Sequence, residues 1–231
     1  MRKGTIVENL NAVRERIVAC CNACGRDPAA VTLLAVSKTR PAEDLRAAYG
    51  AGQRHFGENY LQEALEKREQ LADLDICWHF IGPLQSNKTR AAAEGFHWVH
   101  GVDRLKIAQR LSAQRPRQMP PLNICLQVNI DREQSKSGVA PEEVESLATA
   151  VARLPNIALR GLMAIPAPGE TAEAQRWPFV QMAELLQRLR RCLPDQPLDT
   201  LSMGMSGDME AAIESGATIV RIGTDIFGAR G

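Results

Sequence analysis

Lys38 follows directly after a run of apolar residues, in the stretch Thr-Leu-Leu-Ala-Val-Ser-Lys-Thr-Arg-Pro that runs from Thr32 to Pro41. The run predicts a buried strand, and an ammonium group in apolar surroundings is costly unless it is paired or loses its proton. A lysine that gives up its proton serves as a base or as an amine that condenses with a carbonyl group. A solvated lysine just beyond the strand is the ordinary alternative, since most lysines are exposed.

Two glycine-containing segments near the end of the chain predict an anion site. One is Ser-Met-Gly-Met-Ser-Gly-Asp from Ser202 to Asp208, and the other is Gly-Thr-Asp from Gly223 to Asp225. Glycine lets the backbone approach a ligand closely, and the free N–H groups at a helix start favour an anion. An anion site together with Lys38 indicates a phosphorylated carbonyl compound. Two classes of protein fit, a Schiff-base aldolase for a sugar phosphate and a pyridoxal 5'-phosphate (PLP) protein.

The elements that must position these residues alternate regularly along the chain. Apolar strands that alternate with helices favour parallel pairing, and eight such units favour a closed (β/α)8 barrel, that is, an α/β TIM barrel. A doubly wound sheet is the rival, but it would be expected to carry a glycine-rich turn after its first strand, and residues 37–40 contain no glycine. We expect one domain over residues 1–231, with an additional N-terminal helix. The predicted strands are 32–37, 54–58, 77–82, 98–101, 122–130, 157–165, 200–203 and 219–222, and the predicted helices are 6–25, 41–51, 60–71, 86–94, 103–114, 141–153, 172–192 and 208–215.

Composition excludes several classes of protein. The 231 residues carry a formal charge of +1, and 4% of them are aromatic, which argues against binding of nucleic acid. No apolar run approaches a membrane span, and no signal-peptide pattern follows the basic start, so we expect a cytoplasmic protein without membrane contact. The six cysteines are then expected to be reduced thiols. Cys21-x-x-Cys24 lacks a second ligand pair, and we expect no metal site.

Six stretches resemble the YggS/PROSC family of PLP homeostasis proteins, in the right order and over nearly the whole chain. They are Ala35–Thr39 (AVSKT), His55–Tyr60 (HFGENY), His79–Lys88 (HFIGPLQSNK), Gly161–Met163 (GLM), Leu201–Ser206 (LSMGMS) and Arg221–Gly228 (RIGTDIFG). The resemblance implies the barrel domain of bacterial alanine racemases without their second, β-rich domain. It implies an intracellular protein that holds PLP, buffers it and passes it to the apo-forms of PLP enzymes.

The resemblance assigns roles residue by residue. Lys38 matches the lysine that forms a covalent aldimine with PLP, and Arg221 matches the arginine that faces the pyridine nitrogen. Lys136 matches a lysine near the pocket that assists transfer of PLP. The phosphate cradle corresponds to Ser202, Ser206, Gly223 and Thr224, and the surroundings of the ring correspond to Asn59, His79 and Met163.

Arg221 bears on whether the chain is an enzyme. A PLP ring accepts electrons well when its nitrogen is protonated, and an arginine opposes that protonation because it is always charged. The related racemases complete their site with a tyrosine from the missing domain, contributed by the other subunit, whereas this chain has only Tyr49 and Tyr60. We therefore expect a PLP carrier without robust catalysis, with a minimal amino-acid racemase as the alternative. Loss of the second domain also removes the racemase dimer contact, so we expect a monomer.

Other polar residues have structural alternatives. His79 lies among apolar neighbours, so a hydrogen-bonded core histidine competes with a place beside the cofactor ring. We expect His97 and His100 to be surface or packing residues. Glu58 is expected to be the structural partner of a lysine or an arginine.

Overall fold

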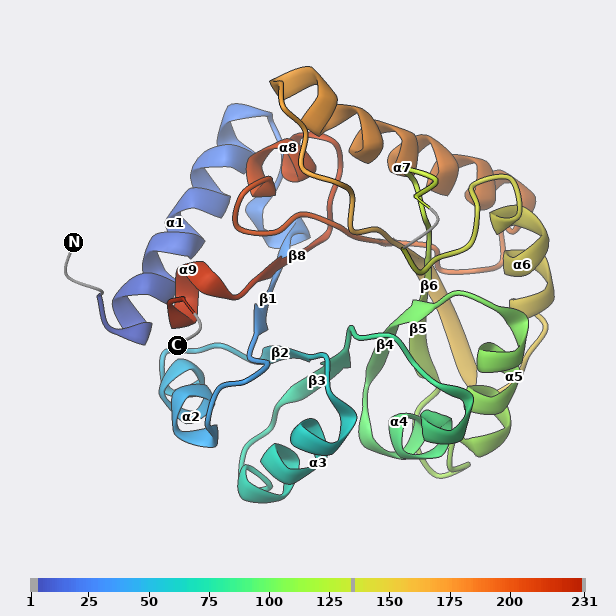
Figure 1. Ribbon diagram of the computed structural model, residues 1–231, viewed down its shortest axis with the longest axis horizontal. Coiled ribbons are helices and arrows are strands. Elements are labelled where there is room, and N and C mark those ends of the chain that lie inside the picture. The colour runs from blue at the N-terminus through green and yellow to red at the C-terminus, as the bar shows by residue number, and fades with distance from the viewer. Residues whose placement is uncertain (1–3, 134–135, 230–231) are drawn as a thin grey trace.

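The computed structural model describes residues 4–133 and 136–229, and within them the chain forms a closed barrel of eight parallel strands. Each strand pairs with its neighbours in chain order, and β1 closes the ring by pairing with β8. Helices surround the strands, as Figure 1 shows. The predicted TIM barrel is therefore confirmed. Of the single domain predicted over residues 1–231, residues 1–3, 134–135 and 230–231 lie outside the described part.

The bounds of the elements follow. The strands are β1 (Thr32–Val36), β2 (His55–Glu58), β3 (Cys77–Phe80), β4 (Trp98–Val102), β5 (Leu122–Gln127), β6 (Ile157–Met163), β7 (Thr200–Ser202) and β8 (Ile219–Ile222). The helices are α1 (Ile6–Ala23), α2 (Ala42–Gly50), α3 (Leu61–Gln70), α4 (Thr89–Gly95), α5 (Leu105–Gln114), α6 (Val144–Val151), α7 (Ala172–Cys192), α8 (Met209–Glu214) and α9 (Thr224–Phe227), with 3-10 turns at Pro28–Ala30 and Ser86–Lys88.

The extra N-terminal helix, α1, was expected from its apolar spacing. Thr5 caps it, because its hydroxyl accepts a hydrogen bond from the Glu8 backbone N–H while the Glu8 carboxylate accepts one from the Thr5 N–H. Its buried face, which includes Leu10 and Ile17, belongs to the main hydrophobic core between the strands and the helices. Figure 1 shows α1 beside α8 and α9, at the place where the barrel closes.

The interior of the barrel differs in composition from the core outside the strands. Among the described residues, a small apolar cluster of Leu34, Ile81 and Ile219 lies inside, with Val36 and Trp98 packed against it. Polar side chains fill much of the remaining interior, because alternate residues of a barrel strand point inward. The buried polar groups include His79, His100, Ser202 and Arg221. These groups must satisfy one another's hydrogen bonds, and they do so in a chain described below.

Some predicted boundaries were too long. The strand predicted over 122–130 ends at Gln127, beyond which the Val128 N–H still donates to the Met163 carbonyl of β6 and Val128 also bridges to Val139. The strand predicted over 157–165 ends at Met163. Within the described residues, no helix combines the length and the apolar character that crossing a bilayer requires.

Candidate functional site

A cavity of about 260 Å³ lies at the carboxyl end of the barrel strands. Segments that follow β1, β2, β3, β6, β7 and β8 contribute its walls, so residues far apart in the sequence meet there. Six of the residues predicted from the sequence line it: Lys38, Asn59, Ser206, Arg221, Gly223 and Thr224. The remaining lining residues are Val36, Ile81, Ile165, Met205 and Gly207.

Lys38 lies half-buried in this wall, in a tight turn directly after β1. The turn is held at both neighbouring residues. The Ser37 backbone N–H donates to the Gly57 carbonyl at 3.0 Å, and the Thr39 N–H donates to Oε1 of Glu63 at 2.6 Å. Thr39 has a positive φ of 63°, a conformation that costs about 1–3 kcal/mol in a residue other than glycine. The surrounding bonds therefore fix the backbone from which the lysine side chain leaves.

A buried ion pair supports this turn from below. Nζ of Lys67 lies 2.8 Å from Oε1 of Glu58 and donates to the Ser37 carbonyl at 2.7 Å. The Ser37 hydroxyl donates to the same Glu58 oxygen at 2.6 Å. Burial raises the pKa of Glu58, while the Lys67 ammonium acts in the opposite direction. The expectation that Glu58 has a structural lysine or arginine partner is confirmed.

Arg221, on β8, is 4% exposed and extends its guanidinium across the barrel. It donates to the carbonyl and the hydroxyl of Ser202, at 2.6 and 3.0 Å, and to the Ala164 carbonyl at 2.8 Å. Burial lowers its pKa to about 10, with the Asp208 carboxylate raising it, so the side chain is still a cation at neutral pH. The cavity therefore has one wall that carries a fixed positive charge.

The two loops after β7 and β8 form a second wall. Ser206 and Gly207 come from the first loop, and Gly223 and Thr224 come from the start of α9. A Cβ atom added to Gly207 would meet no heavy atom within 4 Å, so the space beside this glycine is open. Hydroxyl groups and open backbone beside a cation suit an anionic ligand.

Arg16 of α1 joins these two loops, and sequence reasoning missed it. Its guanidinium lies 2.8 Å from a Glu210 oxygen of α8 and 2.6 Å from an Asp225 oxygen of α9. It also donates to the Ser206 carbonyl at 3.5 Å. No local signal marks Arg16, because it stands on the polar face of an ordinary amphipathic helix almost 200 residues before its partners.

Asn59 forms part of the opposite wall. Its Oδ1 atom is buried and accepts no hydrogen bond from any described residue. The Asn59 backbone is packed tightly against Gly82, where an added Cβ would lie 2.2 Å from the Asn59 carbonyl oxygen. A buried amide oxygen without a donor is costly, so the site offers a place for a ligand donor.

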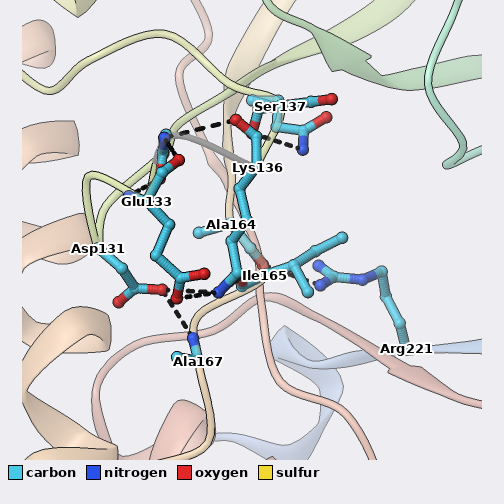
Figure 2. A network of polar contacts seen from close by, with 10 residues as sticks. Asp131, Glu133, Lys136, Ser137, Ala164, Ile165, Ala167 and Arg221 are labelled. Carbon is cyan, nitrogen blue, oxygen red and sulfur yellow. Dashed lines mark hydrogen bonds and ion pairs between the residues drawn. The ribbon is translucent and has the colours of Figure 1, made fainter.

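Lys136 lines an adjoining cavity of about 240 Å³, which shares Asn59, Ile81 and Ile165 with the first. Figure 2 shows its ammonium between Asp131 and Glu133, at 3.1 and 2.9 Å. Burial alone would lower the pKa of Lys136, but hydrogen bonds to the two carboxylates raise it above its usual value. Lys136 is therefore held as an ammonium group beside the mouth of the barrel.

Three of the predicted site residues do not line either cavity. Met163 is fully buried at the end of β6, and His79 and Ser202 lie in a hydrogen-bonded chain within the barrel. Nδ1 of His79 lies 2.9 Å from Nε2 of His100, and Nδ1 of His100 lies 2.8 Å from Oγ of Ser202. The Ser202 hydroxyl also accepts a hydrogen bond from Arg221, so His79 and Ser202 are connected to the cavity through Arg221. A direct role for them beside a cofactor stays a prediction.

Comparison with known proteins gives these residues a family context. Residues 9–231 match the family model "Alanine racemase, N-terminal domain". A relative named pyridoxal phosphate homeostasis protein, from Pseudomonas aeruginosa, is 62% identical over 98% of this chain and 96% of its own. The structure of PipY of Synechococcus elongatus with PLP bound has a TM-score of 0.86 and 39% identity, covering 97% of this chain and all of PipY.

A more distant structure shares the fold alone. Alanine racemase from Corynebacterium glutamicum has a TM-score of 0.68 and 18% identity, and the alignment covers 96% of this chain but 62% of the racemase. The remaining part of the racemase has no counterpart in the aligned chain. The family model and the relatives that match nearly end to end lead to one conclusion: the chain belongs to the alanine racemase N-terminal domain family, in the group that contains the pyridoxal phosphate homeostasis proteins.

Proposed function

We propose that this protein binds PLP as a Schiff base on Lys38 and acts in the homeostasis of PLP, holding it and passing it to apo-enzymes. The observation that carries the proposal is the meeting of Lys38, Arg221 and the Ser206 and Thr224 loops in one cavity. An amine, a cation and an anion-binding wall match the aldehyde, ring and phosphate of PLP. The relatives named for PLP homeostasis and the PLP-bound PipY support the same assignment.

The donor set fits this cofactor. Ser206, Gly223 and Thr224 would hold the phosphate, and Lys38 would supply the amine, which forms a carbon–nitrogen double bond as one water leaves. Asn59 contributes a buried oxygen without a donor from the described chain, which a polar ring substituent can complete. Ile81 and Ile165 provide the apolar surfaces between which a flat ring packs.

Arg221 supports holding rather than catalysis. Bound PLP supplies an electrophilic aldehyde and, when its ring nitrogen is protonated, an electron sink. The Arg221 cation would disfavour that protonation through charge repulsion, and its bonds to Ser202 and Ala164 keep the guanidinium in place. Arg221 would therefore help to bind PLP but would not promote the protonation of the ring nitrogen that amino-acid chemistry needs.

The alternative is a minimal PLP-dependent racemase, which needs a second acid–base group opposite Lys38. Tyr60 is 54% exposed and is not among the residues that line the cavity. Tyr49 lies below the guanidinium of Arg54, with its ring centroid 3.8 Å from Cζ. Neither tyrosine supports the role of the missing acid. Any racemase activity is therefore expected to be weak.

Lys136 supports the transfer part of the proposal. Its place in the cavity next to that of Lys38 makes it a second amine along the exit route. An ammonium group is not a nucleophile, so Lys136 must first lose a proton, which its ion pairs with Asp131 and Glu133 oppose. Until then its charge attracts the phosphate of a departing ligand. A cytoplasmic, monomeric protein, as expected from the sequence, completes the proposal.

Reductive trapping tests the proposal. Borohydride should fix PLP on the protein, and peptide mass spectrometry should place the adduct on Lys38. Lys38→Ala should abolish the adduct and the yellow colour, whereas Lys88→Ala, in the 3-10 turn before α4, should retain both. An adduct on another residue, or none at saturating PLP, would refute the Schiff base. A Lys38-dependent reaction on a sugar phosphate without PLP would instead identify an aldolase.

Chiral analysis tests the carrier against the racemase. The protein is incubated with L-alanine, D-alanine and other amino acids, and the enantiomers are quantified over time. A carrier gives no turnover beyond a slow side reaction that depends on Lys38. Turnover at ordinary enzyme rates would favour the racemase.

A further inference from the structure

We propose that His55, Cys77 and His79 form a binding site for a divalent transition-metal ion, of which Zn²⁺ fits best. His55 and Cys77 are the first residues of β2 and β3, at the end of the barrel opposite the Lys38 cavity, and His79 stands two residues further along β3. Their ligand atoms all lie within 4.8 Å of one another. None of the three residues lines the Lys38 cavity, although the family resemblance places His79 near the cofactor ring. It runs counter to the expectation, from the sequence, that the chain has no metal site.

The register of the two strands brings the ligands together. His55 pairs with Cys77 across the β2–β3 ladder, and His79 stands two residues further along β3, on the same face as Cys77. Two imidazole nitrogens and a thiol sulfur are the ligand types that zinc prefers. The sequence does not show this grouping, because His55 and Cys77 are more than 20 residues apart in the chain.

The distances are close to those of a zinc site. Nδ1 of His55 lies 3.0 Å from Nε2 of His79, and Sγ of Cys77 lies 3.4 Å from the same nitrogen. A tetrahedral zinc ion with normal bond lengths places two nitrogens about 3.3 Å apart and a nitrogen and a sulfur about 3.6 Å apart. These two pairs would reach those distances by an expansion of a few tenths of an ångström, and all three ligand atoms lie within 4.8 Å of one another.

The hydrogen bonding of His79 leaves a conflict that a metal ion resolves. Its Nε2 atom carries either one proton or one lone pair, so it forms one good hydrogen bond. Two neighbours, Nδ1 of His55 and Sγ of Cys77, both compete for it. Without a metal, Nε2 of His79 can serve one of the two contacts as a full hydrogen bond. A zinc ion accepts a lone pair from each of the three atoms, and the proton of the thiol passes to water.

The groups behind the ligands fit the same arrangement. When Nε2 of His79 binds a metal, Nδ1 carries the proton and donates to Nε2 of His100, which in turn donates from Nδ1 to Ser202 Oγ. Zinc-bound histidines normally donate their other N–H to such a partner. The indole of Trp98 stacks on His79, with centroids 5.4 Å apart and an angle of 10°, and holds the ring in place.

Access to the site is open from the amino end of the barrel. His55 and Cys77 are both half-buried, and His55 lines a surface groove of about 490 Å³. Asp75 is exposed two residues before Cys77, and its carboxylate favours the approach of a cation. Three protein ligands leave a fourth position for water, as in zinc sites that bind a further ligand.

Metal titration of the PLP-free protein tests the proposal, since PLP itself chelates divalent ions. After treatment with a chelator, the protein should bind one Zn²⁺ per chain in a competition assay, and Co²⁺ should give a thiolate charge-transfer band. Cys77→Ser should abolish that band, and Cys77→Ser and His55→Asn should each weaken binding of Zn²⁺ by at least about 100-fold, because a first ligand contributes more than the outer partners. His100→Gln should weaken it less.

Matched controls separate this site from the other thiols. Cys24→Ser and Cys192→Ser remove exposed cysteines and should leave zinc binding unchanged. Circular dichroism checks that each variant is folded, and the half-buried positions of His55 and Cys77 make folding of their variants the expected result. Zinc affinity that is unchanged in Cys77→Ser, or lost in Cys24→Ser, would overturn the proposal. So would a wild-type protein that retains no zinc against a weak chelator.

Discussion

Lys67 of α3 and Glu58 of β2 form an ion pair of 2.8 Å in which both side chains are almost fully buried. The pair lies below the turn of Lys38, and the same ammonium group holds the Ser37 carbonyl. The position of the proposed reactive lysine thus depends on a second lysine 29 residues away in the sequence. Removal of Lys67 leaves the Glu58 carboxylate buried without a cation, whereas removal of Glu58 leaves Lys67 paired with Glu63.

The first prediction concerns this pair. Lys67→Met should lower the free energy of unfolding by about 3–5 kcal/mol, because the Glu58 carboxylate stays buried without its partner. Urea denaturation measures the change. Arg90→Met, which breaks the exposed Arg90–Glu94 pair, is the control and should cost less than about 1 kcal/mol. The double variant Lys67→Met/Glu58→Gln should recover part of the loss. Equal losses of stability in Lys67→Met and Arg90→Met would contradict the argument.

A second prediction concerns Arg16, which joins the loops after β7 and β8. Arg16→Ala should raise the dissociation constant of PLP by about 2- to 10-fold. Without the salt bridges of Arg16, the loops after β7 and β8 must become ordered when PLP binds, which costs binding free energy. Absorbance titration with PLP gives the constant. Arg46→Ala, on α2, breaks a comparable salt bridge with Asp73 away from the cavity and should leave the constant unchanged. An equal change in both variants would show a general effect on stability instead.

Gly82 provides a third prediction, since an added methyl group would overlap the Asn59 carbonyl. Gly82→Ala should cost about 1–3 kcal/mol of stability through overpacking, and it should also weaken PLP binding because Asn59 is displaced. Gly50→Ala, at the end of α2, meets no atom within 4 Å and should be neutral or slightly stabilising. Thermal unfolding and PLP titration of both variants are the measurements. Unchanged PLP affinity in Gly82→Ala would exclude Asn59 from the site.

The fourth prediction is a loss of stability in acid that depends on His100. Burial, with the Arg221 cation adding to it, lowers the pKa of His100 from its usual value of 6.5 to about 3. The unfolded chain therefore takes up a proton below about pH 6.5 that the native protein refuses until about pH 3. This contribution is complete above pH 6.5 and is lost as the pH falls, by about 2 kcal/mol at pH 5.

Calorimetry between pH 7.5 and pH 5, with a chelator present, measures this dependence. His100→Gln keeps a donor and an acceptor in the barrel but cannot take up a proton in this range. Its unfolding free energy should change less with pH than that of the wild-type protein. An identical pH dependence in the two proteins would show that His100 is not held neutral.

The barrel was predictable because its signal is local and repeated. Each strand is a short apolar run and each helix has its own amphipathic spacing, so eight units could be identified without knowledge of their contacts. Boundaries were less certain where apolar residues continue beyond the ladder, as at Val128 and Ile165. Helix α9 was missed, because four residues after β8 carry too little periodicity to indicate a helix.

The site was predicted in part, for a related reason. Lys38 and Thr224 stand at strand ends, and a barrel brings all strand ends to one face. Contacts between residues that are distant in the sequence have no such local signal. Arg16 contacts Asp225, and His79 contacts His100, only in the folded barrel. The sequence indicates which side chains follow the strands. Whether a side chain points into or out of the barrel, and which side chain lies next to it, depend on the register of strand pairing.

The mouth of the cavity is bordered by Ile165 and Met205, which are 40% and 39% exposed. A ligand in the cavity would lie beside these two exposed apolar side chains. Under the proposed function, an apo-enzyme whose binding site also has an apolar border could pack against Ile165 and Met205. The ligand would then pass between the two proteins while shielded from water.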